Sequence, residues 1–502
     1  MDWADTAQLA AIVGALGAVT CLVGRSRTPI LAGLALLAAA EAGLVLSLAG
    51  GLPDGLGGTA LALGLVGIVP LAGLAWLFVG RPELVTPLVL AAAPFRLPLD
   101  FDPDHRFFVA VAEAGQLGRL LPLYLVLAAA ALALAVALVR GLEPAPLPPL
   151  LAWPAAAFLA FASLSLLWSS ALTSGASLLA YFLLPFAALV AIVGRAPFPA
   201  WLPRALAAIA VALGCLFAAV GVWQAATERL LFFAPKLEVA NTYGSFFRVT
   251  SLFRDPSLYG RHLVLAAAVV LVMLWLRRLH VAAAAALLAL LFAGLYFSYS
   301  QSSMVALAVV AVGITLAAGD RLARSLVLVL AVAAAVVAGG FLVAELEDES
   351  ARRVTSDRSR RVEVAADVYR AHPVVGAGIG AQPEESQARS ERFGAVGGFV
   401  SHTTPLTVAA ELGSVGLALY AALLGAAAFV LLELRRRDHA LALALGAGLV
   451  ALFVHSLFYS GFFEDPITWL LLAIAASRLA VVEPQPSPAT APTPRRELVP
   501  AS

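Results

Sequence analysis

Residues 120–139 read LLPLYLVLAAAALALAVALV, a stretch in which no side chain is charged. An α-helix needs about 20 apolar residues to cross the hydrocarbon core of a bilayer. Every backbone polar group inside that core must find its partner within the protein, so a run of this kind predicts a transmembrane helix. We place this span at 119–139.

Comparable apolar runs recur on both sides of this span. The other predicted spans are 7–24, 29–50, 57–80, 84–99, 148–168, 174–194, 203–225, 257–276, 279–297, 301–319, 325–345, 405–432, 440–458 and 466–481. The segment 84–99 is short and contains Pro87 and Pro94, so it either crosses the membrane or forms a re-entrant piece. The sequence therefore predicts an all-α, polytopic transmembrane helical bundle of about 14 spans, between about 13 and 15.

The composition agrees with this class. Of 502 residues, 62% are hydrophobic and 13% are charged, whereas soluble domains have about 45–50% apolar and about 25% charged residues. The net charge of +1 gives no information about an acidic partner, and we predict no contact with nucleic acid. The two cysteines, Cys21 and Cys215, form no CxxC motif, which disfavours a zinc or redox site.

Arginines in short connections predict the orientation of the bundle. Counting spans places these arginines on one side, which we assign as cytoplasmic: Arg277, Arg278, Arg321, Arg324, Arg435, Arg436 and Arg437. The connections 226–256, 298–300 and 346–404 then lie on the outer face. The longest of them, 346–404, is the best candidate for a functional loop.

The sequence predicts that the chain is divided into three parts. Residues 1–225 form N-terminal transmembrane helices, and residues 226–482 form a transmembrane core that includes the extracytoplasmic loop 346–404 with short helices. The tail 483–502 is rich in proline and polar residues, which predicts a disordered cytoplasmic segment.

The outer face is rich in arginine, which orientation alone does not explain. The stretch FFRVTSLFRDPSLYGRHL at 246–263 supplies Arg248, Arg254 and Arg261. Guanidinium groups remain charged and bind phosphate oxygens in pairs, so these side chains are candidates for a phosphate site. Arg261 lies just inside a span, where a charge needs a partner; the alternative is that it extends to the outer headgroups.

A second basic stretch lies in the long outer loop. It reads SDRSRRVEVAADVYRAHPVVGAGIG at 356–380, and it predicts a short helix from Asp357 to Ala371. Arg358 and Arg361 share one face of that helix and are further phosphate-binding candidates. The alternative is a solvated basic surface on an exposed loop.

The third stretch, SHTTPLTVAAELGSVG at 401–416, opens the next span. His402 lies just before the start of this span, and a histidine side chain can accept a proton near neutral pH. The alternative is a structural histidine at the start of a helix. Glu411 lies about two turns inside the span, where an ionisable group is a functional candidate.

Together these stretches resemble the O-antigen ligase and O-antigen polymerase superfamily over about 240–480. The spacing typical of that family is present at His402, Leu406, Glu411, Gly413 and Gly416. A preceding pattern of the family is matched by Arg358, His372, Pro373, Gly376 and Gly378. An upstream pattern is matched by Arg248, Phe253, Asp255 and Pro256.

Three positions depart from the family pattern. Thr403 and Ser257 stand where the family usually has asparagine, and Gln301 stands where it has an arginine. If that arginine binds phosphate in the family, Arg254 or Arg261 is the candidate to replace it.

The resemblance implies a GT-C-like membrane glycosyltransferase of cell-surface polysaccharide assembly in the bacterial inner membrane. Such an enzyme transfers or polymerises a glycan from a polyprenyl-diphosphate (for example undecaprenyl diphosphate) donor to a hydroxyl of a glycan, lipid or protein acceptor, on the extracytoplasmic face. It implies inversion at the anomeric carbon without a metal or another cofactor. Ligase and polymerase activities both remain open.

The resemblance also implies roles for particular residues. His402 would be the catalytic base. The donor diphosphate would be bound by Arg248, Arg261 and Arg358, with Arg361 as the alternative to Arg358. Supporting positions would be Arg254, Asp255 and Glu411. The sequence DFDPD at 100–104 is interpreted as a polar loop, with a cation site as the alternative.

Two other classes of function remain as alternatives. A transporter or flippase of a lipid-linked glycan or another amphiphile would also need arginines, but along a path through the membrane. A membrane scaffold would need no catalytic cluster. An enzyme should instead gather the arginines and His402 in one outward-facing pocket.

Overall fold

The computed structural model describes residues 3–49, 56–95, 100–102, 106–108, 120–232, 235–244, 246–346, 358–391, 401, 403–459 and 461–481. Nearly all of the regular structure in these ranges is helical, which confirms the predicted fold class. Two short strands, β1 (Asp100–Asp102) and β2 (Arg106–Phe108), pair antiparallel within the segment that the sequence predicted to be a polar loop.

Eleven helical stretches in the described ranges are long and apolar enough to cross a membrane. They are α1 (Trp3–Val23), α2 (Arg27–Ala49), α5 (Leu121–Val139), α6 (Pro149–Leu164) with its extension η3 (Ser165–Trp168), α7 (Leu172–Leu178) continued by η4 (Leu179–Leu183) and α8 (Leu184–Val193), α9 (Leu202–Thr227), α11 (Pro256–Trp275), α12 (Val281–Ser298), α13 (Gln301–Ala318), α18 (Thr404–Arg437) and α19 (His439–Ser456).

The helix α3 (Leu56–Gly80) is followed by the turn η1 (Pro82–Leu84) and α4 (Val85–Ala92). The two limbs Gly67–Gly80 and Pro82–Ala92 meet at 116°, as in a broken span or a re-entrant loop. Both readings of the 84–99 segment therefore remain open.

Two further helices coincide with predicted spans. They are α14 (Arg321–Leu346) and the shorter apolar α20 (Pro466–Ala480). The total of about 14 spans requires both of these helices and the bent pair, and it stays a prediction.

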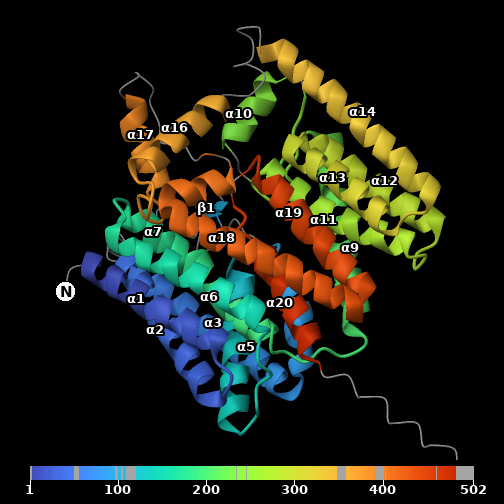
Figure 1. The fold of residues 1–502 in the computed structure, drawn as a ribbon. Helices are drawn as coiled ribbons and strands as arrows, with labels where there is room; N and C mark the ends of the chain where they lie inside the picture. The colour runs from blue at the N-terminus through green and yellow to red at the C-terminus, as the bar shows by residue number, and fades with distance from the viewer. Residues whose placement is uncertain are drawn as a thin grey trace, which may run out of the picture.

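The apolar side chains form two main packing clusters. Figure 1 shows the two groups of helices that carry them. The first joins α1, α2, α5, α6 and α8 to α18 and α20. The second joins α9, α11, α12 and α13, and α19 contributes to both. The helix α19 therefore lies between the two groups. The proposed boundary at 225 stays a prediction, since α9 packs with α11 and α12.

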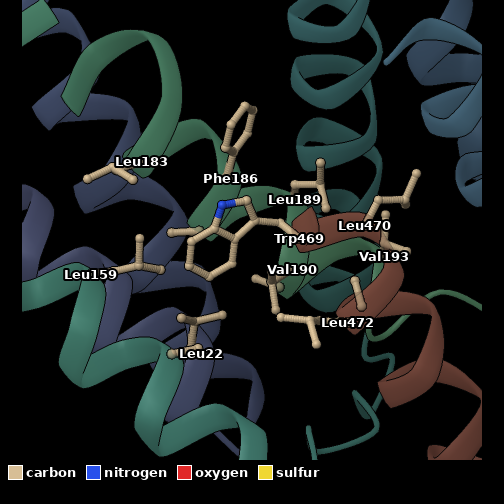
Figure 2. Packing of buried hydrophobic residues seen from close by; sticks show 14 of the residues in the cluster. Leu22, Leu159, Leu183, Phe186, Leu189, Val190, Val193, Trp469, Leu470 and Leu472 are labelled. Atoms are coloured by element: carbon tan, nitrogen blue, oxygen red, sulfur yellow. The ribbon is translucent and has the colours of Figure 1, made fainter. Parts of the chain in front are cut away.

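Trp469 anchors the start of α20 in the first cluster (Figure 2). Its side chain is fully buried, and Leu159 of α6 and Phe186 of α8 lie beside it. The indole Nε1 donates to the carbonyl of Phe463 at 2.9 Å, so the polar end of the ring is satisfied as well. This contact fixes the connection between α19 and α20, which borders the candidate site.

Three short helices lie in the predicted outer connections: α10 (Pro235–Tyr243), α16 (Arg358–Ala371) and α17 (Gln382–Glu391). The predicted helix at 357–371 agrees with α16. This helix packs on α18 and α17, with Ala365 and Val368 buried.

Candidate functional site

Hydrogen bonds bring several helix ends together at one end of the bundle. The carbonyl of Ser257, in the first turn of α11, lies 3.2 Å from His455 Nε2 at the end of α19. It also accepts a hydrogen bond from Ser303 Oγ, in the first turn of α13, at 3.4 Å. Thr403, the N-cap of α18, donates its hydroxyl to the carbonyl of Leu457 at 3.1 Å. The segments that carry the upstream and the His402 motifs therefore meet here.

Arg261 already has a carboxylate partner. Its Nη2 lies 2.7 Å from Asp465 Oδ2, and the two side chains are 3% and 1% exposed. Its Nη1 donates to the carbonyl of Gly461 at 3.4 Å, and Asp465 also caps α20 by accepting the N–H of Ile467 at 2.8 Å. Arg261 thus holds the connection between α19 and α20. Its predicted binding to a diphosphate stays a prediction.

Arg248 is half-buried beside the end of α12. Its backbone N–H donates to Asn241 Oδ1 at 3.0 Å, and its Nε donates to the carbonyl of Ser298 at 3.4 Å. Burial lowers the pKa of Arg248, and the negative charge of Asp255 opposes that effect. Because part of its hydration is already lost, this guanidinium suits an anionic partner better than a fully solvated arginine does.

Asp255 and Arg254 lie at the start of α11. Asp255 is the N-cap of the helix and accepts the N–H groups of Ser257 at 2.7 Å and Leu258 at 3.0 Å. This cap explains a carboxylate immediately before Pro256. Burial lowers the pKa of Arg254, as it does for Arg248. Asp255 was predicted to be a supporting residue of the site. In the structure it has a structural role as the N-cap of α11.

The helix α18 is broken at Gly413, where φ is 65° and ψ is −164°. The loop that follows α16 fills the break. Ala377 N–H and Gly378 N–H donate to the carbonyls of Ala410 and Glu411 at 3.0 and 2.8 Å. On the other side of the break, the N–H groups of Ser414 and Val415 donate to the carbonyls of loop residues at 2.9 and 3.1 Å. The loop thereby satisfies backbone groups that the break would leave unpaired.

The glycines of this loop allow a close backbone approach. Gly376, Gly378 and Gly380 have φ of 74°, 97° and 75°, a region that disfavours other residues. A Cβ on Gly376 would overlap the Glu411 carbonyl group, and one on Gly378 would overlap Ser169. The two family motifs, one around His372 and Pro373 and the other from His402 to Gly416, are therefore one structural unit.

A chain of polar contacts runs from Glu411 to the neighbour of His402. Glu411 is 8% exposed, and its Oε1 accepts the N–H of Gln382 at 3.4 Å. The side chain of Gln382 accepts the N–H of Ser401 at 3.3 Å, and Ser401 Oγ lies 2.7 Å from Thr407 Oγ1. His402 itself lies outside the described residues, but the residues on both of its sides are held.

The helix α16 carries the remaining predicted arginines. Arg358 is its first residue, and the side chain of Arg358 lies outside what the structure describes. Arg361 is half-buried on the same helix. Arg370 is largely exposed and forms a 2.6 Å ion pair with Asp367. The hydrogen bonds between α18 and the loop after α16 fix the position of α16 relative to the start of α18.

Two cavities lie at this end of the bundle. The first, which we call the polar cavity, has a volume of about 60 Å³ and lies between α6, α7 and the first half of α18. Its lining residues are Phe158, Ala162, Leu178, Leu183, Ile379, Thr404, Thr407, Val408, Glu411, Leu412, Gly461, Phe463 and Glu464.

The second cavity, which we call the apolar groove, has a volume of about 370 Å³ between the second half of α18, α19 and α20. It is lined by Leu423, Leu424, Ala427, Ala428, Leu431, Gly446, Leu449, Val450, Phe453, Phe462, Phe463, Thr468, Trp469 and Leu472. Phe463 lines both cavities, so both lie against the connection between α19 and α20.

Several residues of the site were not selected from the sequence. Gln382 and Thr404 belong to ordinary polar stretches, and nothing in their surroundings distinguishes them. Asp465 follows Glu464 between the last two spans, and its partner Arg261 lies far away in the sequence. Gln301, the position of the missing family arginine, is exposed at the start of α13.

Metal binding has little support among the described residues, which hold no group of three or more His, Cys, Asp and Glu side chains suited to an ion. Asp104 of the DFDPD segment lies outside the described residues, so the cation alternative stays open there.

Comparison with protein families identifies one match. Residues 286–421 match the model of the O-antigen ligase family, described as "O-Antigen ligase". No curated protein matches the chain. The matched segment runs from α12 through α16 to the first half of α18, and it includes the loop and the helix break described above. This match confirms the resemblance predicted from the motifs: over these residues the chain is similar to the O-antigen ligase family.

Proposed function

We propose that this protein is a membrane glycosyltransferase that transfers or polymerises a glycan from a polyprenyl-diphosphate donor to a hydroxyl acceptor. The reaction takes place at the outer face of the bacterial inner membrane, and it inverts the anomeric carbon without a metal. The match to the O-antigen ligase family and the arginine-rich helix ends support this proposal.

One observation carries the proposal furthest: the apolar groove and the polar cavity meet at Phe463. A polyprenyl-diphosphate glycan has a long apolar tail joined directly to a charged and hydroxyl-rich head. A groove lined almost entirely by apolar side chains suits such a tail. The arginines before α11 and in its first turns suit the diphosphate of the head.

The chemistry follows from these groups. The acceptor hydroxyl oxygen attacks the anomeric carbon while the bond from that carbon to the diphosphate oxygen breaks. His402 accepts the hydroxyl proton, and polyprenyl diphosphate leaves with the bonding electrons. Arginines directed at its oxygens stabilise the developing charge. Arg248, Arg358 and Arg361 are the candidates, and Arg261 contributes if the diphosphate approaches its pair with Asp465.

The direct test is a transfer assay with purified protein and a defined polyprenyl-diphosphate oligosaccharide. We expect release of polyprenyl diphosphate together with a larger glycan product. His402→Ala should lower the rate by about 10²–10⁴-fold, because a general base is lost. His439→Ala, at the opposite end of α19, should leave the rate unchanged.

The arginines are tested in the same assay. Arg358→Ala should abolish most of the transfer, whereas Arg370→Ala on the same helix should not, because Arg370 is exposed and paired with Asp367. Full activity of His402→Ala or Arg358→Ala would remove that residue from the mechanism. A protein that binds the lipid-linked donors but turns over none of them would favour transport instead.

A further inference from the structure

A group of exposed aromatic rings lies beside Arg248, at the end of α12. The rings of Phe246 and Tyr299 stack with their centroids 4.2 Å apart and their planes 28° apart, and the ring of Tyr296 lies 5.7 Å from that of Tyr299. Phe246 is 47% exposed and Tyr296 is 50% exposed. We call these three residues the aromatic platform. Much of its ring area is not used in packing the helices together, so a ligand can contact it.

The platform includes a residue in an unfavourable backbone conformation. Tyr299, the C-cap of α12, has φ of 49° and ψ of 33°, in the left-handed region. A bulky side chain is disfavoured in that region, and glycine is the usual residue at a helix end of this kind. The tyrosine ring therefore has a cost in stability at this position. Strain of this kind is typical of functional sites, and it points to a role for the ring beyond ending the helix.

Arg248 places a positive charge at the edge of the platform. Its Nε donates to the carbonyl of Ser298, the residue before Tyr299, at 3.4 Å. The amide of Asn241 holds the Arg248 backbone by accepting its N–H and donating to its carbonyl, each at 3.0 Å. The Nη1 and Nη2 groups of Arg248 have no hydrogen bond or ion pair within the described part of the chain, although the charge of Asp255 acts on them from nearby. These two groups can therefore bind an anion such as a phosphate.

Hydrogen bonds connect the platform to the helix ends of the candidate site. Ser300, which follows Tyr299, has its Oγ 2.8 Å from the Oγ of Ser303. Ser303 Oγ donates to the carbonyl of Ser257 at 3.4 Å, and the same carbonyl lies 3.2 Å from His455 Nε2. The platform thus lies at the same end of the bundle as the rest of the site.

We propose that the aromatic platform is the subsite for the donor sugar that is bonded to the diphosphate: this sugar lies against the exposed rings of Phe246 and Tyr299 while Arg248 binds the diphosphate. This inference rests on the proposed transferase function. The C–H face of a sugar ring is apolar, and its hydrogen atoms are attracted to the negative face of an aromatic ring. A ring surface directly beside a free guanidinium fits a ligand in which a sugar is joined directly to a diphosphate.

The test separates the sugar from the diphosphate. Farnesyl diphosphate and farnesyl-diphospho-N-acetylglucosamine differ by one sugar, and the wild-type protein in detergent should bind the glycosylated probe more tightly. Tyr299→Gly should weaken binding of the glycosylated probe about fivefold to tenfold, because one ring contact is lost, and leave binding of farnesyl diphosphate unchanged. Phe246→Ala should have the same effect. Tyr299→Phe keeps the ring and should behave like the wild type, whereas Arg248→Ala should weaken binding of both probes.

The matched control is Glu228→Gly at the C-cap of α9. Glu228 also has a left-handed backbone, with φ of 52°, but it carries no ring and does not belong to the platform. Both glycine variants should remain folded, because glycine is favoured at a positive φ. Glu228→Gly should bind both probes like the wild type, so a loss of sugar binding in Tyr299→Gly reports on the ring and not on the backbone.

Three results would overturn the inference. The first is a wild-type protein that binds neither probe, and the second is Tyr299→Gly and Phe246→Ala proteins that bind both probes like the wild type. The third is an equal loss for both probes, which would mean that the rings serve the membrane interface or the position of Arg248. Sugar binding that depends on Tyr299, in a protein that transfers no glycan, would uphold the subsite and reject the transferase function. Glycan transfer with an unchanged KM for the donor in Tyr299→Gly would reject the subsite and retain the transferase function.

Discussion

Arg261 of α11 and Asp465, the N-cap of α20, form a buried ion pair with 2.7 Å between Nη2 and Oδ2. Both residues lie at helix starts that border the candidate site. The pair holds the connection between α19 and α20, which also provides Phe463 to both cavities. A residue predicted to bind substrate therefore has a structural role as well.

Arg261→Ala or Asp465→Asn should destabilise the protein by about 3–5 kcal/mol, because each leaves a buried charged group without its partner. The double variant Arg261→Met with Asp465→Asn should recover most of that loss, because asparagine keeps the N-cap of α20 without the buried charge. Thermal unfolding in detergent measures stability, and the transfer assay measures activity. A stable double variant with full activity would exclude Arg261 as a ligand of the diphosphate, whereas a stable and inactive one would support that role.

Gly376→Ala should abolish both activity and stable insertion. The new Cβ would overlap the Glu411 carbonyl group, and the φ of 74° at this position strains any other residue. Gly425→Ala in α18, the helix against which Gly376 packs, is the matched control, because a Cβ there meets no atom within 4 Å. Fluorescence-detected size exclusion reports folding. Wild-type behaviour of Gly376→Ala would show that the loop does not pack on the helix break as described.

Arg195 should contribute to stability and not to catalysis. Its Nη2 donates to the carbonyls of Cys21 at 3.0 Å and Gly24 at 2.9 Å, and so closes the C-terminal end of α1. Burial lowers the pKa of Arg195 from its usual value.

Arg195→Ala should therefore cost about 1.5–3 kcal/mol, the usual range for a hydrogen-bonded charged group. A lower midpoint of thermal unfolding, with unchanged transfer rate at low temperature, is the expected result. The exposed Arg204→Ala is the control. A change in KM or kcat of the folded Arg195→Ala protein would contradict this assignment.

The apolar groove should set the dependence on donor chain length. Its lining on α19 runs from Gly446 to Phe453, which corresponds to about 10 Å along a helix. Gly446→Phe should fill it, since a Cβ at Gly446 meets only Leu431 Cδ1, at 3.7 Å. We expect KM for a long polyprenyl donor to rise about tenfold, because the apolar contact of the tail is lost. A donor with a single isoprene unit should be unaffected.

Gly313→Phe on α13 is the control, because a Cβ at Gly313 also meets nothing within 4 Å and Gly313 does not line the groove. Equal effects of Gly446→Phe on long and short donors would mean that the tail lies elsewhere. The comparison uses the same glycan on both donors, so only the tail differs.

The helices were predictable because their signals are local. The run at 120–139 gave a helix at Leu121–Val139, and the uninterrupted stretch before Pro373 gave α16 at Arg358–Ala371. The break at Gly413 was not predicted, since its flanking sequence is apolar and favours a continuous helix from 405 to 432. It forms because the loop after α16 supplies the hydrogen bonds that the helix loses.

The sequence by itself determined that this chain crosses the membrane many times, because backbone groups in a bilayer must pair locally and apolar runs satisfy that condition without help from elsewhere. It also supplied the resemblance to the O-antigen ligase family, which the match over residues 286–421 supports. The tertiary structure decided which of these segments meet. Arg261 finds Asp465, and the loop at Gly376 packs on Glu411, only when helices distant in the chain come together. Buried charges and close backbone contacts of this kind have no signal in a local pattern, since their partners are chosen by packing.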